Sequence, residues 1–242
     1  MIIIAKTDIG KVRSSNQDSY AAGEFRNGVA WAVVCDGMGG NAGGNVASST
    51  AVKYISERIT TSYRENMSAS SIRNLLVTSI TNANYEIFDL AQAKEELQGM
   101  GTTVVAAIIT DNMLYIAHAG DSRAYIISTN EIRQVTTDHS IVQNMVDRGE
   151  ITEEQAQTHP RKNLITRALG VDENLKVDFT EEETVPTDIF LFCTDGLTNF
   201  VSDETIFNLV REDPHSDLAA KLVEAANNAG GGDNITVVTV AR

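Results

Sequence analysis

Apolar residues along the chain fall into short continuous runs and longer helical stripes. Four runs are apolar at almost every position and have the length of strands: Val29–Cys35, Thr103–Thr110, Ile189–Cys193 and Ile235–Val240. Shorter patterns predict strands at Ile2–Thr7, Leu114–Ala119, Ala124–Ile127, Ile132–Thr136 and Leu175–Phe179. Apolar spacing of three and four predicts long helices with stripes from Val46 to Ile59 and from Ile72 to Phe88. Two further helices are predicted at Asp203–Val210 and from Ser216 or Asp217 through Ala229.

The order of these elements indicates an α+β fold with antiparallel sheets. Strands come in runs and helices in adjacent pairs, which differs from the strand–helix alternation of parallel sheets. Strands that are apolar at every position need cover on both faces. We therefore predict a four-layer α-β-β-α sandwich, in which two antiparallel sheets pack together and a helix pair covers each outer face. The chain reads as one domain, residues 1–242, with a polar flap inserted at about residues 138–170.

Composition narrows the class of protein. The formal net charge of −14 has the wrong sign for nucleic-acid binding and disfavours contact with anionic membranes. The longest apolar runs are too short to span a membrane, and the start of the chain lacks a signal-peptide core. Cys35 and Cys193 lie in apolar runs, which predicts small buried side chains in a reducing compartment. We expect a cytoplasmic protein.

The stretch Val33–Gly44, VVCDGMGGNAGG, combines a strand-like run, one carboxylate and a glycine turn. Asp36 ends the run, and five glycines fall within the next eight residues. A carboxylate beside bare backbone suits a hard cation, which binds carboxylate, carbonyl and water oxygens. The same stretch also fits a tight turn whose glycines only supply positive φ. Taken alone, it does not decide between the two.

An aspartate beside a small residue lies at the end of an apolar strand at four places in the chain. They are Asp36-Gly37, Asp121-Ser122, Asp195-Gly196 and Asp233-Asn234. A single case is most simply a turn residue. Four carboxylates gathered at one edge of a sandwich would repel one another unless cations were bound. The motifs contain no histidine or thiolate ligands, so the pattern predicts oxygen-ligated Mg²⁺ or Mn²⁺.

With these motifs, the chain resembles the metal-dependent serine/threonine protein phosphatases of type 2C in their compact bacterial form. The resemblance covers nearly the whole chain and rests on an ordered set of motifs: Thr7-Asp8-Ile9-Gly10, Arg13 with Asn16-Gln17-Asp18, Asp36-Gly37-Met38-Gly39-Gly40, Gly99-Met100-Gly101-Thr102-Thr103, Gly120-Asp121-Ser122-Arg123, Thr137-Asp138-His139-Ser140, Thr194-Asp195-Gly196-Leu197-Thr198 and Gly232-Asp233-Asn234-Ile235-Thr236.

The resemblance implies a role for each candidate residue. Asp36 is expected to bridge two metals, with the Gly37 carbonyl on one of them. Asp195 and Asp233 are expected to hold the other metal, and Asp18 to act through metal-bound water. Asp121 is expected to bind a third metal, as in bacterial members. Arg13 is expected to grip the substrate phosphate. The cofactors would be Mg²⁺ or Mn²⁺, two per site with a weaker third.

The implied reaction is hydrolysis of phosphoserine or phosphothreonine by direct attack of a metal-bridging water or hydroxide. The partners would be phosphorylated proteins, among them a bacterial Ser/Thr kinase and its substrates, and the enzyme would act as a monomer.

One departure from the family pattern is Asn41, because members usually carry a histidine at this position or at that of Met38. Asn41 leaves the general acid unidentified and raises the alternative of a pseudophosphatase binding module. A partner-switch regulatory phosphatase is another alternative, while the acidic composition disfavours a metal-dependent nuclease.

Overall fold

Two antiparallel sheets form the centre of the molecule. The structure is a computed structural model that describes residues 1–40, 43–212 and 217–242. The first sheet contains, in spatial order, β1 (Ile2–Asp8), β11 (Ile235–Ala241), β10 (Ile189–Cys193), β7 (Arg123–Ile127) and β8 (Ile132–Gln134). The second contains β2 (Asp18–Glu24), β3 (Ala30–Met38), β5 (Val104–Ile109), β6 (Met113–Ala119) and β9 (Asp178–Glu183), and the short β4 (Gly101–Thr102) also pairs with β3.

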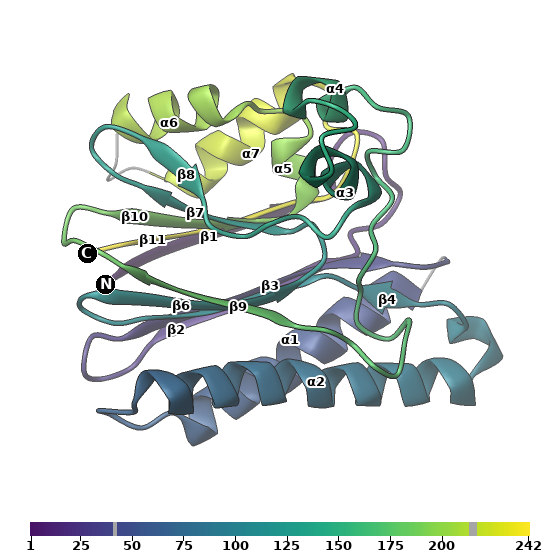
Figure 1. The fold of residues 1–242 in the computed structure, drawn as a ribbon, viewed down its shortest axis with the longest axis horizontal. Helices are drawn as coiled ribbons and strands as arrows, with labels where there is room; N and C mark the ends of the chain where they lie inside the picture. Colours follow the sequence, from purple (N-terminus) through teal and green to yellow (C-terminus); the bar gives the residue numbers. More distant parts are fainter. Residues whose placement is uncertain (41–42, 213–216) are drawn as a thin grey trace.

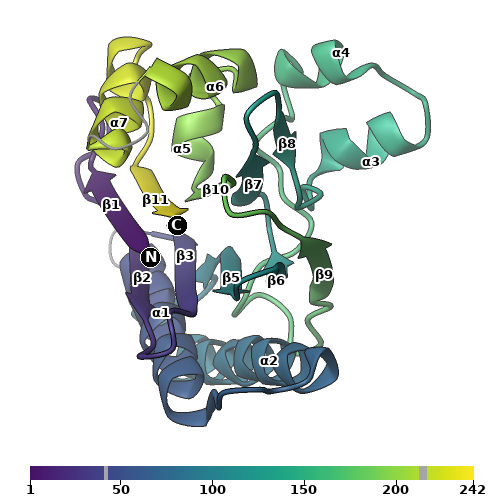
Figure 2. The same cartoon turned by 90° about the vertical axis from the view of Figure 1, so that its left-hand side faces the viewer.

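Helices cover the outer face of each sheet (Figure 1). The second sheet is covered by α1 (Gly43–Ser62) and α2 (Ala69–Ala93), which is followed by the 3₁₀ turn η1 (Glu95–Leu97). The first sheet is covered by α5 (Asp195–Thr198), α6 (Asp203–Glu212) and α7 (Leu218–Asn228). Figure 2 shows the same four layers from the side. The predicted sandwich is therefore confirmed, with the short α5 added to one helix pair.

Three apolar layers explain why the strands read as continuous hydrophobic runs. Along β3, Val33 packs in the layer against α1 and α2, whereas its neighbour Val34 packs in the layer between the two sheets. Both side chains are fully buried. A third layer lies between the first sheet and α5–α7. Successive residues point to opposite faces of a strand, and here both faces are covered. Among the described residues, no helix is long and apolar enough to span a membrane.

Three local features differ from the pattern-based expectation. Strand β2 was not predicted, because DSYAAGE has few large apolar residues. Strand β9 covers Asp178–Glu183 and not Leu175–Phe179, since Leu175 and Val177 pack against the helix layer before the strand begins. Helix α7 is capped by Asp217, whose side chain accepts a hydrogen bond from the Ala220 N–H. The alternative cap, Ser216, lies outside the described residues.

The flap, residues 138–170, leaves the end of β8 and returns toward β9. It carries two short helices, α3 (Ile141–Asp147) and α4 (Glu153–Gln157), and the predicted capping box of Thr152 and Gln155 is present. In Figure 1 these helices lie at the same end of the sandwich as β4 and α5. Both ends of the flap bond to the sheets: the His139 N–H donates to the Gly120 carbonyl at 2.9 Å, and the Leu169 N–H donates to the Thr102 carbonyl at 2.8 Å.

Candidate active site

Asp18 and Asp36 lie opposite each other on the paired strands β2 and β3. The Asp18 side chain is buried, and its Oδ2 accepts hydrogen bonds from the hydroxyls of Thr194 at 2.9 Å and Thr236 at 2.7 Å. Its Oδ1 is buried with no partner. Burial raises the pKa of Asp18 to about 7, although the two hydroxyls oppose that change. Strand β3 continues past Asp36, where the apolar run predicted its end, to Met38 because Gly37 and Met38 pair with β4. Strand β2 thus places a second carboxylate beside Asp36.

Asp36 is surrounded by other carboxylates. Burial raises the pKa of Asp36 well above its usual range, and the charges of Asp18, Asp195 and Asp121 raise it further. Asp195 begins α5, where Asn199 donates a hydrogen bond to its Oδ2 at 2.8 Å. The Asp195 Oδ1 is buried without a partner, and burial followed by the charge of Asp233 raises the pKa of this carboxyl. These mutual effects show that strand ends from both sheets converge.

The turn after Asp36 requires glycine for reasons of space. The Gly37 N–H donates to the Gln17 carbonyl at 3.2 Å. A Cβ on Gly37 would lie 2.1 Å from the Gly44 carbonyl oxygen and 2.5 Å from that of Gln17. Gly39 adopts a positive φ of 110°, which other residues rarely adopt. The glycines therefore bring backbone against backbone beside Asp36. Asn41 lies outside the described residues.

Arg13 and Asp233 form an ion pair across the mouth of the site. The Arg13 guanidinium lies 2.7 Å from Asp233 Oδ2, and the Asn234 N–H donates to Oδ1 at 2.8 Å. The Asn234 side chain donates to the carbonyls of Ile9 and Ser15, both at 2.9 Å, which holds the Arg13 loop to the start of β11. Beside this pair is an open cleft of about 250 Å³, lined by Arg13, Ser14, Ser15, Gln17, Gly39, Gly40 and Asn234.

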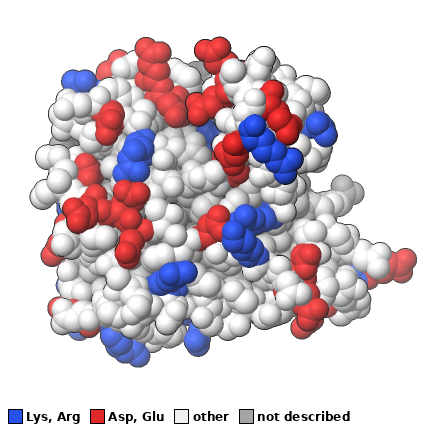
Figure 3. Space-filling view, in the orientation of Figure 1, with Lys and Arg blue, Asp and Glu red and all other residues white. Residues whose placement is uncertain are grey.

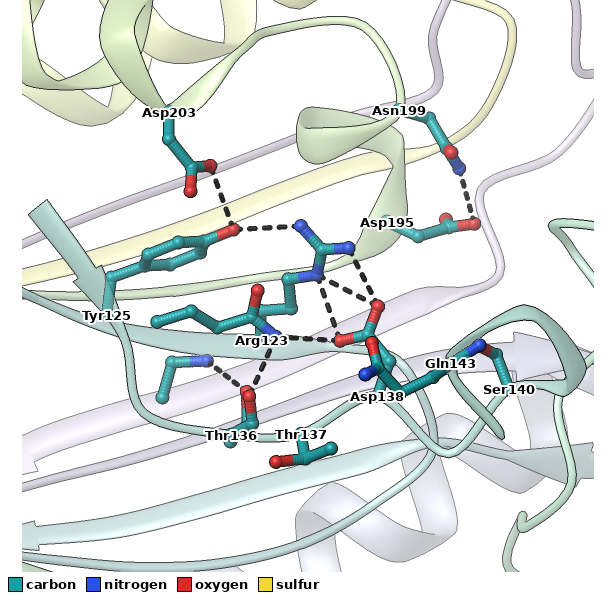
Figure 4. A network of polar contacts seen from close by, with 12 residues as sticks. Arg123, Tyr125, Thr136, Thr137, Asp138, Ser140, Gln143, Asp195, Asn199 and Asp203 are labelled. Atoms are coloured by element: carbon teal, nitrogen blue, oxygen red, sulfur yellow. Dashed lines mark hydrogen bonds and ion pairs between the residues drawn. The ribbon is translucent and has the colours of Figure 1, made fainter. Parts of the chain in front are cut away.

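Asp121 precedes β7 and belongs to the same electrostatic cluster. Burial raises its pKa to about 8, with further contributions from the charges of Asp195 and Asp138. Arg123, in the same motif as Asp121, binds Asp138 at the base of the flap through both Nε and Nη2, at 2.7–3.1 Å (Figure 4). Its Nη1 donates to the Tyr125 hydroxyl at 3.0 Å, and that hydroxyl donates to Asp203 on α6. The flap base, β7 and α6 are joined by this network.

Two histidines form a stacked pair next to the Asp121 turn. The rings of His118 and His139 lie 4.6 Å apart with an interplanar angle of 10°. His139 Nδ1 accepts from the Gly120 N–H at 3.1 Å, and its Nε2 lies 3.1 Å from Asp178. Both side chains are buried. His118 is thus a packed side chain whose Nε2 contacts the Thr137 carbonyl, and His139 is a structural hydrogen-bonding group.

Comparison with known proteins identifies this arrangement. A family model described as Protein phosphatase 2C matches residues 11–235. The chain belongs to the protein phosphatase 2C family. It is 39% identical to the serine/threonine phosphatase stp of Listeria welshimeri, over 98% of this chain and 94% of the relative. The chain is therefore a protein-serine/threonine phosphatase.

Solved structures of other 2C phosphatases have the same fold. The serine/threonine phosphatase Stp1 from Staphylococcus aureus superposes with a TM-score of 0.93 at 34% identity, covering 99% of this chain and 94% of that one. A catalytic domain of the phosphatase PstP, solved in complex with two manganese ions, gives a TM-score of 0.86 at 34% identity, with 98% and 96% covered.

The oxygen atoms of this 2C phosphatase fit a divalent cation. Asp18 Oδ1 and Asp195 Oδ1 are buried and unpaired, and burying an unpaired carboxylate oxygen is costly unless a proton or a cation compensates. Within the described ranges, no three acidic, histidine or cysteine side chains converge at metal-ligand distances. Asp233 is paired with Arg13 in this structure. The donor set suits Mg²⁺ or Mn²⁺ by chemistry.

The roles of three polar groups in this site were not predicted from the sequence. The hydroxyls of Thr194 and Thr236 bind Asp18, and the Asn234 side chain fastens the Arg13 loop. Each lies directly beside a strand-end aspartate or within its motif. Their position next to Asp195 and Asp233 was the available signal, because small polar residues at the ends of buried strands need hydrogen-bond partners.

Proposed function

We propose that this phosphatase is a metal-dependent enzyme that hydrolyses phosphoserine and phosphothreonine in proteins, and that it opposes a Ser/Thr kinase. The observation that carries the proposal is the pair of buried, unpaired carboxylate oxygens on Asp18 and Asp195. These two residues belong to one electrostatically coupled group with Asp36, Asp121 and Asp233. Such a cluster is costly in a metal-free protein and suits a cation-binding role. The two manganese ions in the structure of the PstP catalytic domain add support.

In the proposed site, Asp36, the Gly37 carbonyl, Asp195 and Asp233 would hold two metals. Asp121 would contribute to a third, and Asp18 would act through metal-bound water. When bound, divalent metals lower the pKa of water and offset charge on phosphoryl oxygens. Either Mg²⁺ or Mn²⁺ fits an all-oxygen donor set.

The chain's own residues orient the substrate. Arg13 has a fork of N–H donors that matches two phosphoryl oxygens, and its side chain is 53% exposed at the edge of the cleft. The hydroxyls of Thr194 and Thr236 fix the orientation of Asp18. The turn through Gly39 and Gly40 forms the opposite wall of the cleft without side chains that would obstruct a phosphate. The flap, whose base is joined to the Asp121 turn through the His139 N–H and the Gly120 carbonyl, is the proposed surface for the rest of the phosphoprotein.

We further propose that the enzyme acts as a monomer in the cytoplasm. Cys35 and Cys193 are both buried free thiols, which supports a reducing compartment. On the face shown in Figure 3, acidic and basic side chains are interspersed, without the continuous basic stripe that nucleic-acid-binding surfaces carry.

The test measures release of phosphate from p-nitrophenyl phosphate and from a phosphothreonine peptide. Rates with Mn²⁺, with Mg²⁺ and with EDTA are compared for the wild type, Asp36→Asn and Asp195→Asn. Asp111→Asn, at the exposed turn between β5 and β6, is the matched control. We expect metal-dependent release that falls at least 100-fold in the two site variants and is unchanged in the control. If the protein binds the metal but releases no phosphate from either substrate, it is a binding module and not an enzyme.

Opposition to a kinase requires a second measurement. A Ser/Thr kinase domain from the same cell, autophosphorylated in vitro, serves as substrate for the wild type and for Asp36→Asn. Loss of its phosphothreonine signal with the wild type alone supports the proposal. If the kinase stays phosphorylated while the peptide is dephosphorylated, the kinase is not a substrate. The proposed phosphatase activity is unaffected by that result.

A further inference from the structure

The ladder between β3 and its neighbours β4 and β5 is interrupted at Asp36. Val34 pairs with Val105 and Gly37 pairs with Thr102, so Asp36 lies opposite Thr103 in the same register. The Thr103 N–H donates to the Asp36 carbonyl at 2.9 Å, as in a regular ladder. The Asp36 N–H, however, donates to the hydroxyl of Thr103 at 2.9 Å. A side-chain oxygen therefore takes the place of a main-chain carbonyl at this one position, and Thr103 belongs to neither β4 nor β5.

The same hydroxyl connects Asp36 to the Asp121 turn. Thr103 Oγ1 lies 2.7 Å from the hydroxyl of Ser122, the residue after Asp121. Thr103 is 2% exposed and Ser122 is 1% exposed. Because the Thr103 hydroxyl accepts from the Asp36 N–H, it retains its own hydrogen and a second lone pair for Ser122. One buried hydroxyl thus contacts the main chain of Asp36 and the neighbour of Asp121.

Close packing holds Thr103 in this orientation. A Cβ on Gly120 would lie 2.6 Å from the Thr103 side chain, so the threonine packs directly on the backbone that precedes Asp121. Next to it, the Thr102 hydroxyl donates to the Asp36 carbonyl at 2.8 Å. A β-branched residue of this shape has restricted χ1 freedom, which keeps the hydroxyl directed toward Asp36.

We propose that Thr103 is a positioning residue whose hydroxyl sets the main chain of Asp36, and therefore the direction of its carboxylate, relative to Asp121. A regular ladder would instead bring the Asp36 N–H to the main-chain carbonyl oxygen of Thr103. Groups that orient metal-binding carboxylates affect metal affinity by about 10–100-fold. The consequence for metal binding rests on the proposed function, whereas the hydrogen bond itself can be tested without metal.

Three variants separate the hydroxyl from the shape of the side chain. Thr103→Val keeps the β-branched shape and removes the acceptor, and Thr103→Ser keeps the hydroxyl and removes the methyl group. Thr239→Val is the matched control, because Thr239 is a buried threonine on β11 whose hydroxyl donates to the Ile4 carbonyl at 3.2 Å. Hydrogen exchange of the Asp36 amide is followed by NMR in EDTA, and Mn²⁺ affinity is measured by calorimetry.

In EDTA we expect Asp36 amide exchange to be at least tenfold faster in Thr103→Val than in the wild type, Thr103→Ser and Thr239→Val. In the calorimetric titration we expect the Kd for Mn²⁺ to rise about 10–100-fold in Thr103→Val and less than threefold in Thr103→Ser, relative to the wild type. With p-nitrophenyl phosphate at saturating Mn²⁺, kcat should fall while KM changes little.

Two outcomes overturn the inference. Unchanged Asp36 exchange in Thr103→Val shows that the hydroxyl does not hold this amide. Equal defects in Thr103→Val and Thr103→Ser show that packing matters and the hydroxyl does not. A wild type that binds no Mn²⁺ refutes the proposed function instead, and the exchange measurement still decides the role of Thr103.

Discussion

The Arg13 guanidinium lies 2.7 Å from the Asp233 carboxylate, so a residue proposed to bind phosphate neutralises a residue proposed to bind metal. The hydrogen bond and charge of Asp233 raise the pKa of Arg13, and the charges of Asp36 and Asp195 act in the same direction. A divalent ion on Asp233 would compete for this carboxylate. Arg13, on an exposed loop, would then be free to bind an anion in the cleft.

Arg13→Ala should weaken substrate binding and leave metal binding intact. Loss of hydrogen bonds to a charged phosphate is worth about 1.5–3 kcal/mol, which corresponds to a rise in KM of roughly 10–100-fold for a phosphopeptide. The Mn²⁺ Kd should stay the same or fall, because Asp233 loses its competing cation. Steady-state kinetics and calorimetry measure the two effects, with Arg26→Ala in the exposed turn after β2 as control. A Kd that rises as much as KM would place Arg13 in the metal site.

The metal-free protein should lose stability as the pH rises from about 4 to about 8. Asp121 has a folded pKa of about 8 and an ordinary unfolded value near 3.8, so the folded state binds more protons across this window. Asp18, with a pKa of about 7, acts in the same direction. Urea unfolding in EDTA should show this slope in the wild type and a shallower slope in Asp121→Asn. Parallel slopes would contradict the prediction.

His139 should have the opposite effect on the acid side. Burial, reinforced by His118, lowers the pKa of His139 to about 4, below the unfolded value of about 6.5. The unfolded state therefore binds more protons in this window, and stability is lost as the pH falls from about 6.5 to about 4. The difference in unfolding free energy between wild type and His139→Gln should shrink over that range. A difference that is independent of pH would refute the assignment.

Breaking the Arg123–Asp138 pair should destabilise the fold more than breaking an exposed pair. The two side chains are 27% and 12% exposed, so we expect a loss of about 2–3 kcal/mol for Arg123→Met, less than for a fully buried pair. The double variant Arg123→Met/Asp138→Asn should recover part of the loss, since no unpaired charge remains. Arg133→Met, which breaks the exposed pair with Glu182, should cost under about 1 kcal/mol. Equal losses from both single variants would show that burial of the Arg123 pair is unimportant.

Much of the sandwich could be predicted because its strands are covered on both faces. The runs around Val33, Phe192 and Val238 mark buried strands, and the aspartates beside these runs belong to one electrostatic cluster. Cys35 and Cys193 are buried and free, as their apolar surroundings indicated. These features depend on local pattern, which a single sequence carries well.

Features that depend on partners distant in the chain were harder to predict. Asp18 and Asp36 face each other only because β2 pairs with β3, and β2 has too weak an apolar pattern to be recognised. The Arg13–Asp233 pair joins residues 220 positions apart. The hydroxyl of Thr103 acts at an interruption of the ladder that has no sequence signature of its own.

Strand β11 lies between β1 and β10 and immediately follows Asp233. During synthesis, the first strand therefore waits for its hydrogen-bonding partner until the final strand has emerged. That strand also delivers Thr236, one of the two hydroxyls on Asp18. A nascent chain that lacks these residues carries only four of the five aspartates proposed for the site, so the proposed site can assemble only after β11 has been made.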